Sequence, residues 1–194
     1  MSSMSDVLDF WLGPEEARDA PAREYQQLWF MKNPQFDDEL KARFGMLLGQ
    51  AASGELDAWA ATPRGKLALI IVLDQFSRNI DRDRPGMFSN DEKALDLAHN
   101  AIDHGEDRAL KFAERQFLYM PLMHAEDLQS QERCVALFEQ LAEADERYKL
   151  NLDFAIRHRD IVARFGRFPH RNGILGRTCT AEELEFLRRP GTSF

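Results

Sequence analysis

The chain has 194 residues, of which 44% are hydrophobic and 30% are charged; this balance excludes a disordered protein and favours one globular domain over 1–194. The formal net charge of -8 disfavours nonspecific attraction to nucleic acids and to anionic membranes. Cys134 and Cys179 are too few for a disulfide framework or a structural zinc site, so we expect two free thiols and a cytoplasmic protein.

The sequence predicts neither a targeting signal nor a membrane span. The N-terminus, MSSMSDVLDFWLG, lacks the basic region of a secretion signal. The longest apolar run, LALIIVL at 67–73, is far shorter than the roughly 20 residues that cross a bilayer. We therefore expect no membrane partner.

The first part of the chain predicts three helices. Ser5 is placed to cap a short first helix, which Gly13-Pro14 ends. A second helix is expected from Pro21 to Met31. Apolar residues at positions 36, 40, 44, 47, 48 and 51 follow a 3.6-residue period, and Gly54 is placed to end this third helix.

The middle of the chain predicts two more helices. Thr62-Pro63 supplies a cap and a first-turn proline for a helix that extends to about Gln75. The run LALIIVL alone would also suit a buried strand, but no second strand-like run exists to pair with it. After a turn-rich loop at 81–87, apolar residues from Ala94 to Ile102 trace a helical face that Gly105 closes.

The remaining sequence continues the helical pattern. A helix is expected over about 108–120, with Pro121 kinking or ending it. Apolar spacing predicts further helices over 128–141 and 152–165, and Gly166 is placed to end the second of them. Thr180 and Glu183 form a capping box for a short last helix. The predicted fold class is therefore all-α, a multihelical array of antiparallel helical hairpins.

Several segments of the sequence resemble one bacterial family. They are LDFWLG (8–13), GELDAWAATP (54–63), TPRGKLALIIVLDQFSRNI (62–80), FLYMPLMHAEDLQSQERCVALFE (117–139) and RHRDIVARFGRFPHRNGILGRTCTAEELEFL (157–187). The family is catalogued as domain of unknown function 924, and the resemblance covers nearly the full length of the chain. It implies an all-helical, tetratricopeptide-like superhelix, but it implies no reaction.

Basic residues concentrate near the C-terminus of this acidic chain. Between positions 155 and 177 one acid, Asp160, faces six arginines, at positions 157, 159, 164, 167, 171 and 177. Guanidinium groups are planar forks that suit carboxylates and phosphates, so the segment is a candidate anion site. The alternative is that ion pairs and helix-end carbonyls hold these arginines and tie the segment down.

We expect the anion to bind in a groove lined by basic and polar side chains. One side is formed by Arg164, Arg167, His170, Arg171 and Asn172, and the other by Arg78, Asp74 and His124. For Asp74 and Arg78, a plain ion pair four residues apart on one helix is the favoured alternative. His170 and His124 are also candidates for a general acid or base, with Glu126 as an orienting carboxylate, whereas a packed histidine with one hydrogen bond is the plainer interpretation.

Three hypotheses for the function stay open. The first is a protein that binds an anionic small molecule or a peptide carboxylate. The second is a metal-independent enzyme with a histidine acid or base and arginine substrate clamps. The third is an RNA-contacting surface in which Phe165 and Phe168 stack on bases, which the net charge disfavours. The sequence contains no metal-ligand spacing and no cofactor motif, and it is compatible with a homo-oligomer.

Overall fold

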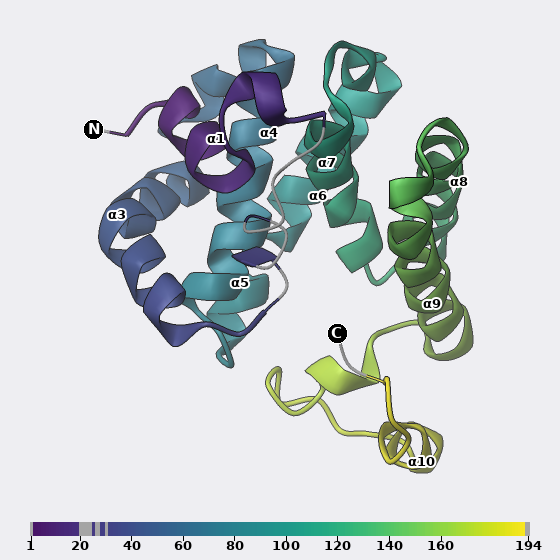
Figure 1. The fold of residues 1–194 in the computed structure, drawn as a ribbon. Helices are drawn as coiled ribbons and strands as arrows, with labels where there is room; N and C mark the ends of the chain where they lie inside the picture. Colours follow the sequence, from purple (N-terminus) through teal and green to yellow (C-terminus); the bar gives the residue numbers. More distant parts are fainter. Residues whose placement is uncertain (1, 20–24, 26–27, 30, 193–194) are drawn as a thin grey trace. The chain divides into compact units, whose positions relative to one another are not determined.

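A computed structural model describes residues 2–19, 25, 28–29 and 31–192 of the chain (Figure 1). These residues form helices, short 3-10 turns and loops, with no β-strand among them, so the all-α prediction is confirmed. The chain divides into two compact units, Met1–Arg82 with Gly86–Pro121, and Asp83–Pro85 with Leu122–Phe194. The single-domain expectation stays a prediction. The helix predicted from Pro21 to Met31 lies for the most part outside the described residues.

The first helix of the first unit, α1 (Met4–Leu12), begins two residues earlier than the sequence suggests. Ser3 is the cap, because its hydroxyl accepts a hydrogen bond from the backbone N–H of Asp6 while the Asp6 carboxylate accepts from the Ser3 backbone. The prediction that Ser5 caps this helix is therefore wrong. Gly13 ends α1 as expected, with a φ of 79°. The short 3-10 turn Glu15–Ala17 follows.

The long apolar run lies at the centre of the first unit. It forms α4 (Pro63–Ile70), which continues through a π-helical stretch, Ile71–Phe76, into α5 (Ser77–Ile80). Thr62 caps α4 as predicted, since its Oγ1 accepts from the N–H of Gly65 at 3.1 Å. The predicted end near Gln75 is wrong, because the π turn accommodates one extra residue and the helix runs on with Asp74 and Gln75 buried.

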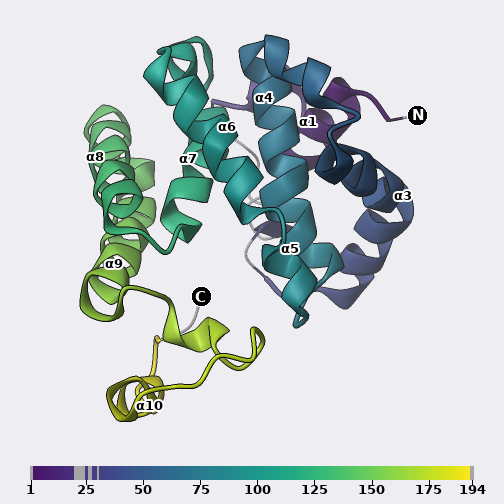
Figure 2. The same ribbon diagram turned by 180° about the vertical axis from the view of Figure 1, so that it is seen from behind.

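Two further helices pack on either side of this central helix (Figures 1 and 2). One is α3 (Pro34–Ser53), capped by Asn33 and ended by Gly54, and the other is α6 (Asp91–Asp103). The core between them is aromatic: the ring centroids of Phe44 and Phe76 are 5.0 Å apart, and those of Trp11 and Phe76 are 5.5 Å apart. The buried aromatic residues thus fill the core, as their helical spacing indicates.

The rest of the first unit contains short turns and the start of α7. The 3-10 turns are Asp57–Ala61, Pro85–Phe88 and Glu106–Ala109. Pro85, the first residue of the second turn, is grouped with the second unit. Helix α7 (Phe112–His124) continues through Pro121 for three further residues, so of the two predicted outcomes, a kink or an end at this proline, the end is excluded. None of the helices within the described residues is both long and apolar enough to cross a membrane.

The second unit begins with an antiparallel helical hairpin. Helices α8 (Leu128–Ala144) and α9 (Lys149–Phe165) lie side by side in both ribbon views, joined by the 3-10 turn Glu146–Tyr148. Gly166 ends α9 in the left-handed conformation, as predicted. Helix α10 (Ala181–Leu187) begins with the predicted capping box of Thr180 and Glu183. Both cysteines are free thiols, and Cys134 is buried in α8.

Candidate functional site

The basic segment forms a compact loop after α9. Its anchor is Phe168, which is fully buried and packs against Ile161 and Val162 of α9. A 3-10 turn, Pro169–Arg171, follows directly, and Gly166 before it supplies the left-handed φ of 67° that reverses the chain. The loop therefore folds back onto the end of the helix from which it emerges.

Three arginines of the segment bind glutamates of the same unit. The pairs are Arg164 with Glu182, Arg167 with Glu183 and Arg177 with Glu126, at nitrogen–oxygen distances of 2.7, 2.7 and 2.6 Å. The pKa of Glu183 is lowered to about 2, chiefly by the hydrogen bonds from Arg167, because these outweigh the effect of burial. These contacts agree with the alternative in which ion pairs tie the segment down.

Glu126 is the point where the loop meets the end of α7. Its Oε1 accepts from the backbone N–H of Phe168 at 2.8 Å, and both oxygens accept from Arg177. Partial burial alone would raise the pKa of Glu126, but the hydrogen bonds from Arg177 and Phe168 and the nearby charge of Arg171 lower it on balance. The carboxylate is therefore ionised at neutral pH and is suited to orienting other groups rather than to donating a proton.

A buried amide fixes the turn that carries His124 and Glu126. Gln131 of α8 is fully buried, and its Nε2 donates to the carbonyls of Met123 and Ala125 at 2.7 and 2.8 Å. Two backbone carbonyls, one in the last turn of α7 and one just after it, are thereby satisfied away from water. His124 lies between these two fixed carbonyls.

Arg171 contacts the backbone and a buried ring of this part of the fold. Its side chain is buried, its Nη2 donates to the His124 carbonyl at 2.9 Å, and its guanidinium lies 4.6 Å from the centre of the Phe168 ring. A guanidinium over an aromatic face combines a cation–π contact with apolar packing. The structure thus brings Arg171, His124 and Phe168 together.

Two further imidazoles lie against the Phe168 ring. The ring centroids of His158 and His170 are each 5.5 Å from that of Phe168. The pKa of His158 is lowered to about 3, chiefly by burial and also by the charges of His124, His170 and Arg171, which together outweigh the hydrogen bond to the Phe154 carbonyl. His158 is therefore neutral at pH 7, and because its Nδ1 lies 2.7 Å from the Phe154 carbonyl, which can only accept, that nitrogen carries the proton.

We name the group His124, His158, Phe168, His170 and Arg171 the histidine–arginine cluster. The charges of Arg171 and Arg177 both act on Glu126, so two guanidinium groups face one carboxylate at the edge of this cluster. Phe168, proposed above as a base-stacking ring, is fully buried and is not available for stacking on RNA.

The other predicted binding residues, Asp74 and Arg78, belong to the first unit. Arg78 Nη2 lies 3.0 Å from Asp74 Oδ1 and 2.8 Å from Asp91 Oδ1, so the favoured ion pair is present and a second carboxylate joins it. Asp74 is 1% exposed, which makes this pair part of the interior rather than a surface contact. Burial alone would lower the pKa of Arg78, but the two carboxylates raise it on balance.

The comparisons with known proteins agree with the family resemblance noted in the sequence. A family model described as a bacterial protein of unknown function, DUF924, matches residues 7–191. The chain belongs to the DUF924 family. A solved structure of a protein of unknown function from Agrobacterium tumefaciens is 40% identical, covers 95% of this chain and 96% of its own, and has a TM-score of 0.82. No curated protein is similar enough to count as a relative.

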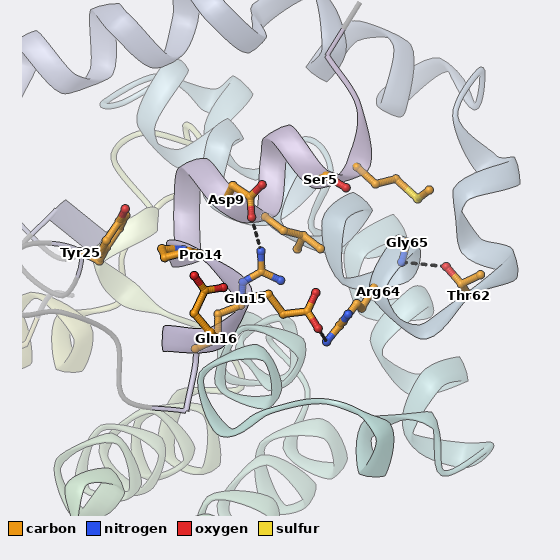
Figure 3. Close-up of a pocket in the computed structure, with 12 residues that line it drawn as sticks. Ser5, Asp9, Pro14, Glu15, Glu16, Tyr25, Thr62, Arg64 and Gly65 are labelled. Carbon is orange, nitrogen blue, oxygen red and sulfur yellow. Dashed lines mark hydrogen bonds and ion pairs between the residues drawn. The ribbon is translucent and has the colours of Figure 1, made fainter.

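In this DUF924 protein a cavity that the sequence did not indicate lies in the first unit. It has a volume of about 650 Å³ and is lined by α1, the turn after it, Tyr25 and the start of α4 (Figure 3). The charged lining residues are Asp9, Glu15, Glu16, Arg18 and Arg64. These charges are scattered along the sequence and resemble an ordinary solvated helix surface, so no pattern singles them out.

His158 and Gln131 also contribute to the fold of the second unit. His158 shares one face of α9 with buried Ala155, Ile161 and Val162, at positions three or four residues apart. A polar residue on an apolar helical face is a usable signal, because such a residue must find a partner inside the protein. The same signal identifies Gln131, which stands beside buried Cys134 and Val135 on α8.

Proposed function

We propose that this DUF924 protein binds a small anionic ligand, a carboxylate or phosphate group of a metabolite or peptide, at the histidine–arginine cluster. The observation that carries the proposal is the arrangement around Glu126, where the charges of Arg171 and Arg177 both act on a single carboxylate. Arg171 is also buried, and its guanidinium lies over the Phe168 ring. The arginine fork and the adjacent imidazoles supply donors suited to oxyanions.

The ion pairs of the neighbouring arginines support a division of roles within the segment. Arg164, Arg167 and Arg177 hold the loop through Glu182, Glu183 and Glu126, and Arg171 with His170 and His124 is assigned to the ligand. We also propose that the hairpin of α8 and α9 is part of a tetratricopeptide-like superhelix, a type of fold that presents ligands with a concave face. The fold supports this second point by analogy only.

A thermal-shift screen tests the proposal. Inorganic phosphate, succinate, nucleoside monophosphates and short acidic peptides are added to the wild type and to Arg171→Lys, which keeps the charge and loses the fork. A ligand at one hundred times its dissociation constant adds about 2.7 kcal/mol, a midpoint rise on the order of 5 to 11 °C for this chain length. We expect a rise in the wild type that Arg171→Lys removes.

The control variant is Arg164→Gln, which removes a half-exposed arginine whose partner is Glu182. It changes the net charge by one unit but leaves the histidine–arginine cluster intact, so the ligand response is expected to persist. A response that weakens in Arg164→Gln and persists in Arg171→Lys would indicate nonspecific charge attraction. No response to any probe, with Arg171→Lys melting far below the wild type, would assign the cluster to stability alone.

A further inference from the structure

The cavity of the first unit has walls that the backbone fixes. Gly13 has a φ of 79°, and a Cβ at this position would lie 2.9 Å from Cε2 of Tyr25, so the tyrosine ring packs directly against the glycine. On the opposite side, a Cβ on Gly65 would lie 1.9 Å from the carbonyl oxygen of Trp59. Both glycines permit approaches that no other residue allows. The cavity is thus a built feature, and its volume of about 650 Å³ suits a small molecule.

The arginine at the base of this cavity is fully engaged. Arg18 is buried, and its three nitrogens donate to the Gly13 carbonyl at 3.0 Å, to Glu114 Oε1 at 3.0 Å and to Asp9 Oδ1 at 2.6 Å. Arg64 is more exposed, and its Nη2 lies 2.7 Å from Glu15 Oε1. The guanidinium groups therefore orient the carboxylates of the wall.

The carboxylates, by contrast, keep much of their surface open. The side chain of Asp9 is 58% exposed and that of Glu15 is 55% exposed, and each binds its arginine through one oxygen. Glu16 is exposed and makes no hydrogen bond to any part of the chain that the structure describes. In Figure 3 these three acids lie between Tyr25 on one side and Arg64 with Thr62 on the other.

The charge of the lining favours a cation. Three carboxylates face two guanidinium groups, a formal excess of one negative charge among the lining residues. Behind them, the negative charge of buried Glu114 is offset by Lys111, whose Nζ donates to the Glu15 carbonyl at 2.8 Å. Apolar surface is contributed by Met4, Leu8 and the ring of Tyr25. An aromatic face beside carboxylates is a favourable setting for an organic ammonium group.

We infer that this cavity binds a small organic amine, protonated at neutral pH, whose ammonium group lies among Asp9, Glu15 and Glu16 and whose apolar part contacts Leu8 and Tyr25. The inference does not depend on the function proposed above, because every lining residue belongs to the first unit. It assigns to the cavity a ligand of the opposite charge to the one proposed for the histidine–arginine cluster.

Three probes of similar size and different charge test this inference on the full chain. They are phenethylamine, 2-phenylethanol and 3-phenylpropionate, titrated into ¹⁵N-labelled protein while the amide spectrum is recorded. We expect phenethylamine to shift amides of 4–16 and 62–65 saturably, and the alcohol and the carboxylate to bind more weakly. Equal binding of the alcohol, tighter binding of the carboxylate, or no saturable shift in these segments would overturn the inference.

A matched pair of variants isolates the carboxylates of the cavity. Glu16→Gln removes one charge from an exposed side chain without altering a contact of the fold, and Glu132→Gln removes one charge from an exposed position on α8. One unit charge a few ångströms away in water corresponds to about fivefold in affinity, so Glu16→Gln is expected to weaken phenethylamine binding by about that factor. Glu132→Gln is expected to bind as the wild type does, and equal affinities in both variants would refute the assigned ammonium position.

Discussion

The buried contact between Arg18 and Glu114 offers the sharpest test of how the first unit is held together. Glu114 is 0% exposed, and its Oε1 accepts from Arg18 while its Oε2 accepts from the backbone N–H of Lys111 at 2.9 Å. Glu114→Gln keeps the shape of the side chain and removes its charge. Arg18 retains Asp9 as a partner, so the cost is expected near the low end for a broken buried pair, roughly 3 kcal/mol.

Urea and thermal unfolding of the variant measure this cost. For a chain of this length roughly 3 kcal/mol corresponds to a fall in the melting temperature of about 6 to 12 °C. Glu16→Gln makes the same chemical change on an exposed side chain and is expected to leave the melting temperature within about 2 °C of the wild type. A Glu114→Gln variant that melts with the wild type would show that the charge of Glu114 contributes nothing, and the reasoning would fail.

Three further predictions concern single positions. Gly65→Ala would place a Cβ 1.9 Å from the Trp59 carbonyl oxygen and is expected to lower the free energy of unfolding by about 2 to 3 kcal/mol. A Cβ at Gly49 would have no atom within 4 Å, so Gly49→Ala is expected to raise the free energy of unfolding by about 0.5 to 1 kcal/mol. Urea titrations measure both. The reverse order of the two alanine variants would refute this interpretation. The pKa of His158 is about 3 in the fold, so the imidazole binds a proton more readily in the unfolded chain. The free energy of unfolding of the wild type is therefore expected to fall as the pH drops below about 6.5, by up to about 1.4 kcal/mol per pH unit. His158→Gln should remove this dependence, and parallel stability curves for the two proteins between pH 7 and pH 4 would contradict it.

Helix positions could be predicted from the sequence because their signals are local. Gly54 and Gly166 end helices in the left-handed conformation, and the capping box at Thr180 begins the last helix as expected. The errors arose where local signals compete or where the outcome depends on tertiary packing. Ser3 and Ser5 are both suitable caps, and the carboxylate of Asp6 decides for Ser3. The extension of the central helix past Gln75 depends on burial of polar groups within the core, which periodicity does not report.

The candidate site was predictable in part. The charge anomaly around 158–177 singled out a loop against which Glu126 and the His124 carbonyl lie in the structure. Which arginine pairs with which glutamate depends on contacts up to 51 residues apart, so Arg171 could not be separated from Arg164, Arg167 and Arg177 in advance. The cavity of the first unit gave no signal, because its concavity comes from chain segments that meet only in the fold.

Titration of inorganic phosphate into ¹⁵N-labelled protein tests the central claim most directly, because the amide spectrum reports both binding and its place. The account predicts saturable shifts at the amides of Phe168, His170, Arg171 and Asn172, retained in Arg164→Gln and lost in Arg171→Lys. Shifts confined to other parts of the chain, or a response that never saturates and is the same in both variants, would contradict an anion site at the histidine–arginine cluster.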